Sequence, residues 1–130
     1  MVKKTKRSIQ WVRQDNQLKY AGAHWLIEFW GAKIIEDSKK VEKILIVAAK
    51  KAKNTPLKVV IHKFNPKGIT GVVLLAESHI ALHSWPEIDY LAIDIFTCGK
   101  KSFPGKALNY FKKEFKPKKV VTTKIKRGII

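Results

Sequence analysis

The chain has 130 residues, a hydrophobic content of 45% and a formal net charge of +17. This length and composition fit one globular domain and argue against a disordered chain, and no apolar run is long enough to cross a membrane. With a single cysteine, Cys98, the chain forms no internal disulfide, so we expect a cytoplasmic protein without a membrane partner.

The positive charge comes from 27 Lys and Arg residues against 10 Asp and Glu residues. Such an excess favours contact with phosphates, so a basic nucleic-acid-binding module is one function to weigh. The basic residues are spread along the chain, however, and no arginine-rich or glycine-rich nucleic-acid motif is present. The charge therefore indicates solubility or weak binding of polyanions, and no specific nucleic-acid partner is expected.

Hydrophobic periodicity predicts eight elements after residue 20. Alternating apolar residues indicate strands, and apolar residues spaced three and four apart indicate helices. In chain order these are a strand at 23–31, a helix at 38–53, strands at 57–64, 70–77, 78–85 and 90–98, a helix at 104–115 and a strand at 118–127. Asp37 or Ser38 is expected to cap the first helix, and Pro104 suits the start of the second.

The order of these elements predicts the fold class. Because it contains few parallel crossovers, we expect an α+β protein, a two-layer sandwich with a mainly antiparallel sheet and helices on one face. Residues 1–20 are polar and basic, and are expected to form an extension to a domain that spans 21–130.

The segment LLAESHIALHSW (74–85) places polar side chains inside predicted strands. Burying Glu77, Ser78 and His79 there is unfavourable unless each finds a partner. A metal site is not expected, because His79 and His83 would stand about 13 Å apart on a strand that rises about 3.3 Å per residue. A serine hydrolase is not expected either. The neighbours of Ser78 point to the opposite face of the strand, and no G-x-S-x-G motif is present.

Five short motifs, in a fixed order along the chain, suggest a function for this segment. They are HKF (62–64), TGVV (70–73), AESH (76–79), HSWPE (83–87) and DIFTCG (94–99). In this order they resemble the prokaryotic S-adenosylmethionine decarboxylase proenzymes, and the likeness runs from about Gly22 to the C-terminal KIKRG. The most specific part is AESH, with a histidine five residues after the serine and a cysteine twenty residues after it.

The resemblance implies an inactive precursor that cuts itself between Glu77 and Ser78. The products would be a chain of residues 1–77 and a chain of residues 78–130 whose first residue has become a pyruvoyl group. The resemblance implies that this group is the cofactor. It would form a Schiff base with the substrate amine and act as an electron sink during decarboxylation.

Three further residues take roles from their positions in the motifs. His83 matches the base that removes a proton during processing, a task suited to a histidine near neutral pH. Thr70 falls where the family often has serine, as a hydroxyl that assists processing. Threonine keeps this hydroxyl and adds a methyl group that restricts χ1. Cys98 matches the donor that protonates the decarboxylated substrate carbon.

The substrate is expected to be S-adenosylmethionine, converted to S-adenosylmethioninamine for spermidine biosynthesis. Phe64 and Trp85 match aromatic positions suited to adenine stacking and to contact with the sulfonium, and Glu87 is placed to bind the ribose hydroxyls. Arginine or ornithine remains an alternative substrate, and a non-enzymatic basic module is the alternative of another class. The resemblance also implies a homodimer of cleaved protomers with the active site near their interface.

Overall fold

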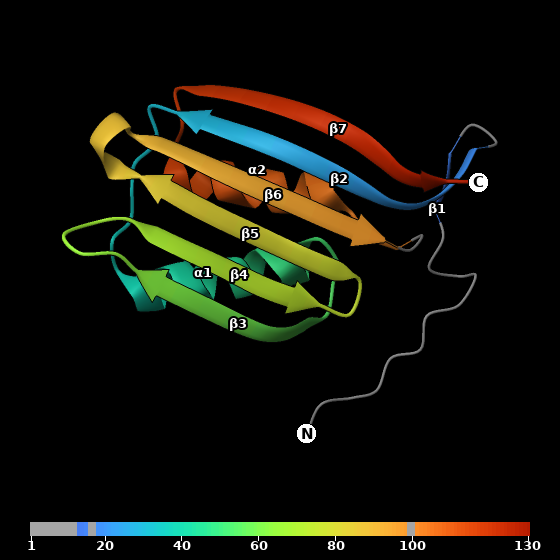
Figure 1. Cartoon of the computed structure of the whole chain (residues 1–130), viewed down its shortest axis with the longest axis horizontal. Helices are drawn as coiled ribbons and strands as arrows, with labels where there is room; N and C mark the ends of the chain where they lie inside the picture. The colour runs from blue at the N-terminus through green and yellow to red at the C-terminus, as the bar shows by residue number, and fades with distance from the viewer. Residues whose placement is uncertain (1–12, 16–17, 99–100) are drawn as a thin grey trace.

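The computed structural model describes residues 13–15, 18–98 and 101–130, which form one sheet with two helices on one of its faces (Figure 1). The strands are β1 Arg13–Asp15, β2 Leu18–Trp30, β3 Pro56–Lys63, β4 Ile69–Leu75, β5 Ser78–Trp85, β6 Tyr90–Cys98 and β7 Lys119–Ile129. The helices are α1 Ser38–Lys51 and α2 Pro104–Phe115, and a 3-10 turn, η2, covers Pro86–Ile88. The predicted α+β two-layer architecture is confirmed.

The sheet has the order β1-β2-β6-β5-β4-β3, and β7 also pairs with β2. Every pair of strands is antiparallel. The long strand β2 begins at Leu18, five residues before the predicted start at 23, and β1 pairs with its first residues. The part of the predicted extension at 13–15 and 18–20 therefore joins the sheet, whereas residues 1–12 lie outside the described part of the chain.

Helix α1 begins at the predicted cap. The side chain of Asp37 accepts hydrogen bonds from the backbone N–H groups of Lys39 and Lys40, at 3.0 and 3.3 Å. These bonds satisfy two donors that the first turn of a helix leaves free. The helix ends at Lys51, two residues earlier than predicted, and Lys53 adopts a left-handed φ of +61°. In the described part of the chain, neither helix is long and apolar enough to span a membrane.

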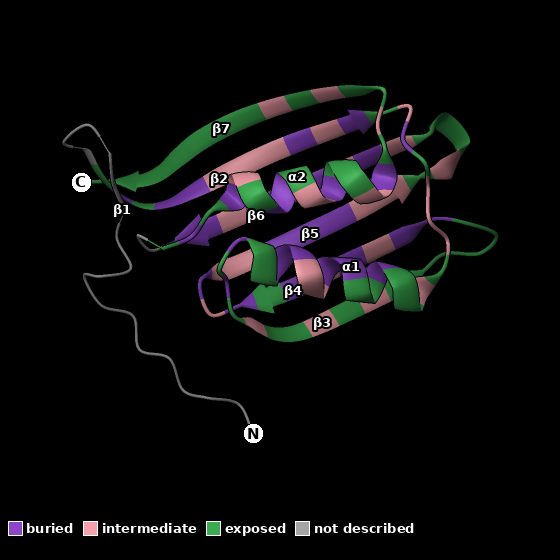
Figure 2. Ribbon diagram, turned by 180° about the vertical axis from the view of Figure 1, so that it is seen from behind, coloured by how far each residue is buried: buried purple, intermediate pink, exposed green. Residues whose placement is uncertain are grey.

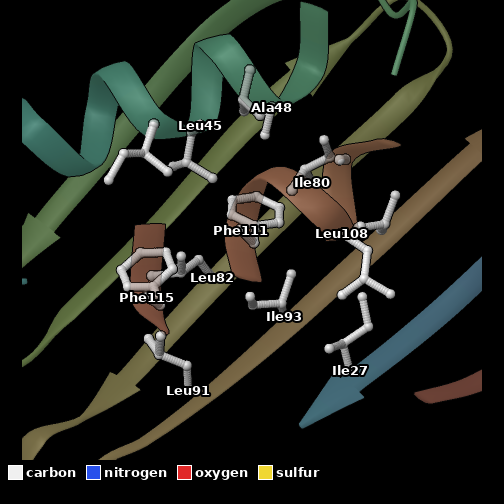
Figure 3. Packing of buried hydrophobic residues seen from close by; sticks show 14 of the residues in the cluster. Ile27, Leu45, Ala48, Ile80, Leu82, Leu91, Ile93, Leu108, Phe111 and Phe115 are labelled. Atoms are coloured by element: carbon white, nitrogen blue, oxygen red, sulfur yellow. The ribbon is translucent and has the colours of Figure 1, made fainter. Parts of the chain in front are cut away.

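The hydrophobic core lies between the helices and the sheet. Figure 3 shows Phe111 and Phe115 of α2 facing side chains of β5 and β6, with Leu45 of α1 beside them. All three are at most 1% exposed. Helix α1 approaches β4 closely at Gly71, where a Cβ would lie 2.8 Å from a methyl group of Leu45. A side chain at Gly71 would therefore force the side chains of Leu45 and Ile61 to shift.

The opposite face of the sheet, which we call the open face, carries no helix (Figures 1 and 2). Large apolar residues on it alternate with the core residues of their strands. Those that are exposed are Trp30, Val60, Leu74, Trp85, Val121 and Ile125, at 40–54% of their surface. A monomeric protein rarely exposes so many large apolar side chains on one face, so this face is suited to contact with another surface.

Candidate active site

Glu77 and Ser78 lie at the tight turn between β4 and β5. Leu75 pairs directly with Ser78, so Ala76 and Glu77 alone make the connection. The predicted strand 70–77 therefore ends at Leu75, because two of its residues are needed to reverse the chain. Ser78 has a φ of +154°, in a region that residues with a Cβ rarely adopt. Backbone strain is thus located at Ser78, directly beside the Glu77–Ser78 peptide bond.

The carbonyl oxygen of Glu77 accepts two hydrogen bonds from Cys98. The backbone nitrogen of Cys98 lies 3.1 Å from this oxygen, and its Sγ lies 2.8 Å away. Cys98 is 3% exposed and ends β6 beside Ser78, because its neighbour Thr97 is the cross-strand partner of Ser78. Two donors on one carbonyl stabilise negative charge that develops on its oxygen, which favours attack of a hydroxyl on its carbon.

Two threonines that the sequence did not single out also lie against this turn. Thr55 donates its backbone N–H and its hydroxyl to the carboxylate of Glu77, at 2.8 and 3.2 Å. Thr97 is fully buried, and its Oγ1 has no hydrogen-bond partner among the described residues. The sequence around Thr55 and Thr97 does not indicate these contacts, because each residue is about twenty positions from the turn along the chain.

A second polar cluster joins Thr70 on β4 to His83 on β5. The two residues are direct cross-strand partners, and Oγ1 of Thr70 lies 3.1 Å from Nδ1 of His83. The His83 ring lies 6.3 Å from the ring of Trp85, which in turn lies 5.3 Å from the ring of Tyr90. A hydroxyl and an imidazole are therefore held in hydrogen-bond contact beside two aromatic rings.

The three predicted substrate-binding residues lie at the same end of the sheet as His83. Phe64 follows β3, Trp85 ends β5, and Glu87 is part of the 3-10 turn; all three are exposed. Gly68 lies between Phe64 and this turn. Its carbonyl accepts a hydrogen bond of 2.8 Å from the backbone N–H of Phe64, and a Cβ at Gly68 would lie 3.8 Å from both the Phe64 ring and Pro86. The two exposed rings and the exposed carboxylate are thus available to a ligand.

The two clusters lie toward opposite ends of β5, the strand labelled in Figure 1. Ser78 begins the strand and His83 is five residues further on. At about 3.3 Å per residue, this spacing corresponds to roughly 16 Å between their backbones. One chain therefore brings Glu77, Ser78 and Cys98 together, and Thr70 and His83 together, but it does not bring the first group to the second.

On the open face, between these clusters, the rings of His24 and His79 both pack against the ring of Phe96. The rings of His24 and His79 lie 5.1 and 5.7 Å from the ring of Phe96, and His24 Nε2 lies 3.9 Å from a carboxylate oxygen of Asp94. Burial lowers the pKa of His79, and the neighbouring His24 lowers it further. Within the described ranges, no three His, Cys, Asp or Glu side chains gather as ligands for a metal ion.

Comparisons with known proteins show which family of proteins this chain is similar to. The sequence profile of the S-adenosylmethionine decarboxylase family matches residues 23–128. An S-adenosylmethionine decarboxylase proenzyme of Pelotomaculum thermopropionicum is 44% identical over 115 residues, which cover 87% of this chain and 91% of that protein. A proenzyme of the same name from Methanococcus vannielii is also 44% identical over 115 residues, with 87% and 94% covered.

A solved structure extends the comparison to the fold. The crystal structure of the adenosylmethionine decarboxylase from Aquifex aeolicus VF5 superposes with a TM-score of 0.78 at 35% sequence identity. The match covers 84% of this chain and 92% of that one. The family profile covers most of this chain and these relatives are similar over nearly their whole length, so the chain belongs to the S-adenosylmethionine decarboxylase family.

Proposed function

We propose that this protein is a pyruvoyl-dependent S-adenosylmethionine decarboxylase that is made as a precursor and cleaves itself between Glu77 and Ser78. The product would be S-adenosylmethioninamine, the aminopropyl donor for spermidine biosynthesis. The observation that carries the proposal is the Glu77–Ser78 turn, where a positive φ at Ser78 coincides with two donors from Cys98 on the Glu77 carbonyl. Family membership supplies the reaction that this geometry suits.

Cleavage begins when the hydroxyl of Ser78 attacks the carbonyl carbon of Glu77. A C–O bond forms, the C–N bond breaks, and the hydroxyl proton passes to the nitrogen of Ser78, so an ester replaces the amide. A base then removes the α-proton of Ser78, and the Cβ–O bond breaks with its electrons on the carboxylate of Glu77. The remaining dehydroalanine tautomerises, and water replaces its nitrogen as ammonia, which leaves a pyruvoyl group on the chain that begins at residue 78.

The surroundings of Ser78 suit such a group. Once formed, the pyruvoyl supplies an electron sink for the electrons released with carbon dioxide. The Sγ of Cys98 lies 2.8 Å from the carbonyl oxygen of the residue before Ser78, so a thiol is at hand on the same side of the turn. Cys98 then donates a proton to the substrate carbon. Phe64 and Trp85 hold the adenine and the sulfonium by stacking and by cation–π attraction, and Glu87 accepts hydrogen bonds from the ribose.

A homodimer would bring the two polar clusters together across its interface, each cluster of one protomer facing the other cluster of its partner. A two-fold axis that packs two open faces together with their strands antiparallel would set His83 and Thr70 of one protomer near Ser78 and Cys98 of its partner. Both His83 and Cys98 occupy positions that alternate with the core residues of their strands. The exposed apolar side chains of the open face would contribute to such an interface.

Complementation between two inactive variants tests this pairing. His83→Ala keeps Ser78 and loses the base, whereas Ser78→Ala keeps the base and loses the nucleophile. When the two are co-expressed with different tags, heterodimers contain one complete site, and about half of the His83→Ala chains should be cleaved if protomers mix at random. Mass spectrometry of the separated tags measures this fraction.

The control replaces the Ser78→Ala partner by a Ser78→Ala/His83→Ala double variant, which supplies no imidazole and should leave every chain intact. Isolated heterodimers whose His83→Ala chain is not cleaved would show that His83 does not act across an interface. The His83→Ala chain alone should contain the ester, because the acyl shift precedes proton removal. Hydroxylamine should then cut this variant between Glu77 and Ser78.

A substrate panel tests the reaction itself. Carbon dioxide release from carboxyl-labelled S-adenosylmethionine, arginine and ornithine is measured with the cleaved protein. We expect kcat/KM for S-adenosylmethionine to exceed the other two by at least about a hundredfold, because only this substrate fits the aromatic and ribose-binding groups. Trp85→Ala should raise KM for S-adenosylmethionine and leave cleavage unchanged. Equal or greater release from arginine or ornithine would transfer the chemistry to that substrate.

A further inference from the structure

The connection between α1 and β3 contacts the predicted cleavage turn at three points, all through Thr55. Its backbone N–H lies 2.8 Å from one carboxylate oxygen of Glu77, and its hydroxyl lies 3.2 Å from the other. Its carbonyl accepts a hydrogen bond of 3.0 Å from the backbone N–H of Ala76. A residue 22 positions away in sequence thus binds both residues of the turn.

These contacts matter because the carboxylate of Glu77 is buried, with 9% of the residue exposed. A buried charge is stable only when its oxygens are hydrogen-bonded. Thr55 supplies one donor to each oxygen, so the Glu77 side chain has a single favourable orientation. Together with the two donors of Cys98 on the Glu77 carbonyl, this leaves little freedom for the acyl group that Ser78 would attack.

The same connection also reaches Cys98. The side-chain nitrogen of Asn54 donates to Oγ of Ser102 at 2.7 Å, and that hydroxyl donates to the carbonyl oxygen of Cys98 at 2.8 Å. The connection itself is held in place, because the backbone N–H of Asn54 binds Ala49 of α1 at 2.9 Å. The end of a packed helix is therefore linked through Thr55 to the side chain of Glu77, and through Asn54 and Ser102 to Cys98, which donates to the Glu77 carbonyl.

We propose that Thr55 is a positioning residue for self-cleavage, which acts by orienting Glu77 so that its carbonyl carbon stays within reach of the Ser78 hydroxyl. The proposal rests on the proposed cleavage between Glu77 and Ser78. Thr55 binds the carboxylate of Glu77 and the backbone N–H of Ala76, and not the Glu77 carbonyl that would react. Its effect should therefore fall on the rate of cleavage, and the turnover of protein that has already been cleaved should change less.

The test compares cleavage rates of freshly translated precursor in four forms. Thr55→Val removes the hydroxyl at nearly constant shape and leaves one oxygen of a buried carboxylate without its donor, so cleavage should slow about tenfold or more. Thr55→Ser keeps a hydroxyl and should restore the rate to within about threefold. Thr122→Val is the matched control. Thr122 lies on β7, which pairs with β2 and is separated from β3 and β4 by other strands of the sheet, so this variant should cleave like the wild type.

A double-mutant cycle separates positioning from a general loss of stability. In a Glu77→Ala background the carboxylate is absent, so Thr55→Val should cause no further slowing. The folded state is checked by thermal unfolding in Ser78→Ala precursors with and without Thr55→Val, which remain uncleaved. Wild-type cleavage by Thr55→Val, or equal slowing in the presence and absence of the Glu77 carboxylate, would overturn the proposal. If the wild-type chain itself is never cleaved, the proposed function fails instead.

Discussion

The Ser78→Ala variant is expected to remain a single chain of 130 residues and to release no carbon dioxide from S-adenosylmethionine. Alanine has no hydroxyl to attack the Glu77 carbonyl, so neither the ester nor the pyruvoyl group can form. The wild-type protein should separate into residues 1–77 and 78–130, the second with a carbonyl in place of its N-terminal amine. Intact mass spectrometry with a carbonyl-reactive probe measures both products.

Ser38→Ala is a suitable control for this variant. Ser38 is the first residue of α1, and the cap of that helix is provided by Asp37, so this change should affect neither folding nor cleavage. Fragments from Ser78→Ala that end at residue 77 would show that another group breaks the bond. A wild-type chain that stays intact after prolonged incubation would favour the non-enzymatic basic module.

Cys98→Ala is expected to lose two to four orders of magnitude in decarboxylation per cleaved molecule, about the contribution of general acid catalysis. It should also be cleaved more slowly, because one of the two donors on the Glu77 carbonyl is lost. Cleavage should still occur, since the backbone N–H of Cys98 stays 3.1 Å from that oxygen. Single-turnover release of carbon dioxide, corrected for the cleaved fraction, measures the first effect, and the time course of fragment formation measures the second.

Cys98→Ser separates the two roles of the side chain. A hydroxyl still donates to the Glu77 carbonyl, so cleavage should be faster than in Cys98→Ala, but it is a weaker acid than a thiol, so decarboxylation should remain slow. If the proton went to the former carbonyl carbon of the pyruvoyl residue instead of the substrate carbon, hydrolysis would release the substrate as an aldehyde and leave its amine nitrogen on residue 78. Residue 78 would then be alanine, and the mass of the 78–130 fragment reports this change. A cleaved Cys98→Ala protein with wild-type turnover and no alanine would show that Cys98 is only a packing residue.

Much of the fold was predictable from the sequence because the relevant interactions are local. The strand at Tyr90–Cys98 and the helix at Pro104–Phe115 begin and end where the periodicity and Pro104 predicted. The cap of α1 at Asp37 followed from one side chain and the backbone three residues ahead. Strand ends were less predictable. The length of β4, for example, depends on where β5 pairs with it, which periodicity does not encode.

The sequence by itself determined the family, because AESH, the histidine and the cysteine have a spacing along the chain that can be read without a structure. The distance between Ser78 and His83 within one chain could also be predicted from the sequence, since both residues belong to one strand. Only the tertiary structure decided that Cys98 binds the Glu77 carbonyl and that Thr55 binds its carboxylate. These contacts depend on the register of β5 with β6 and on the position of α1 over the sheet, both of which are set by packing between residues that are distant in sequence.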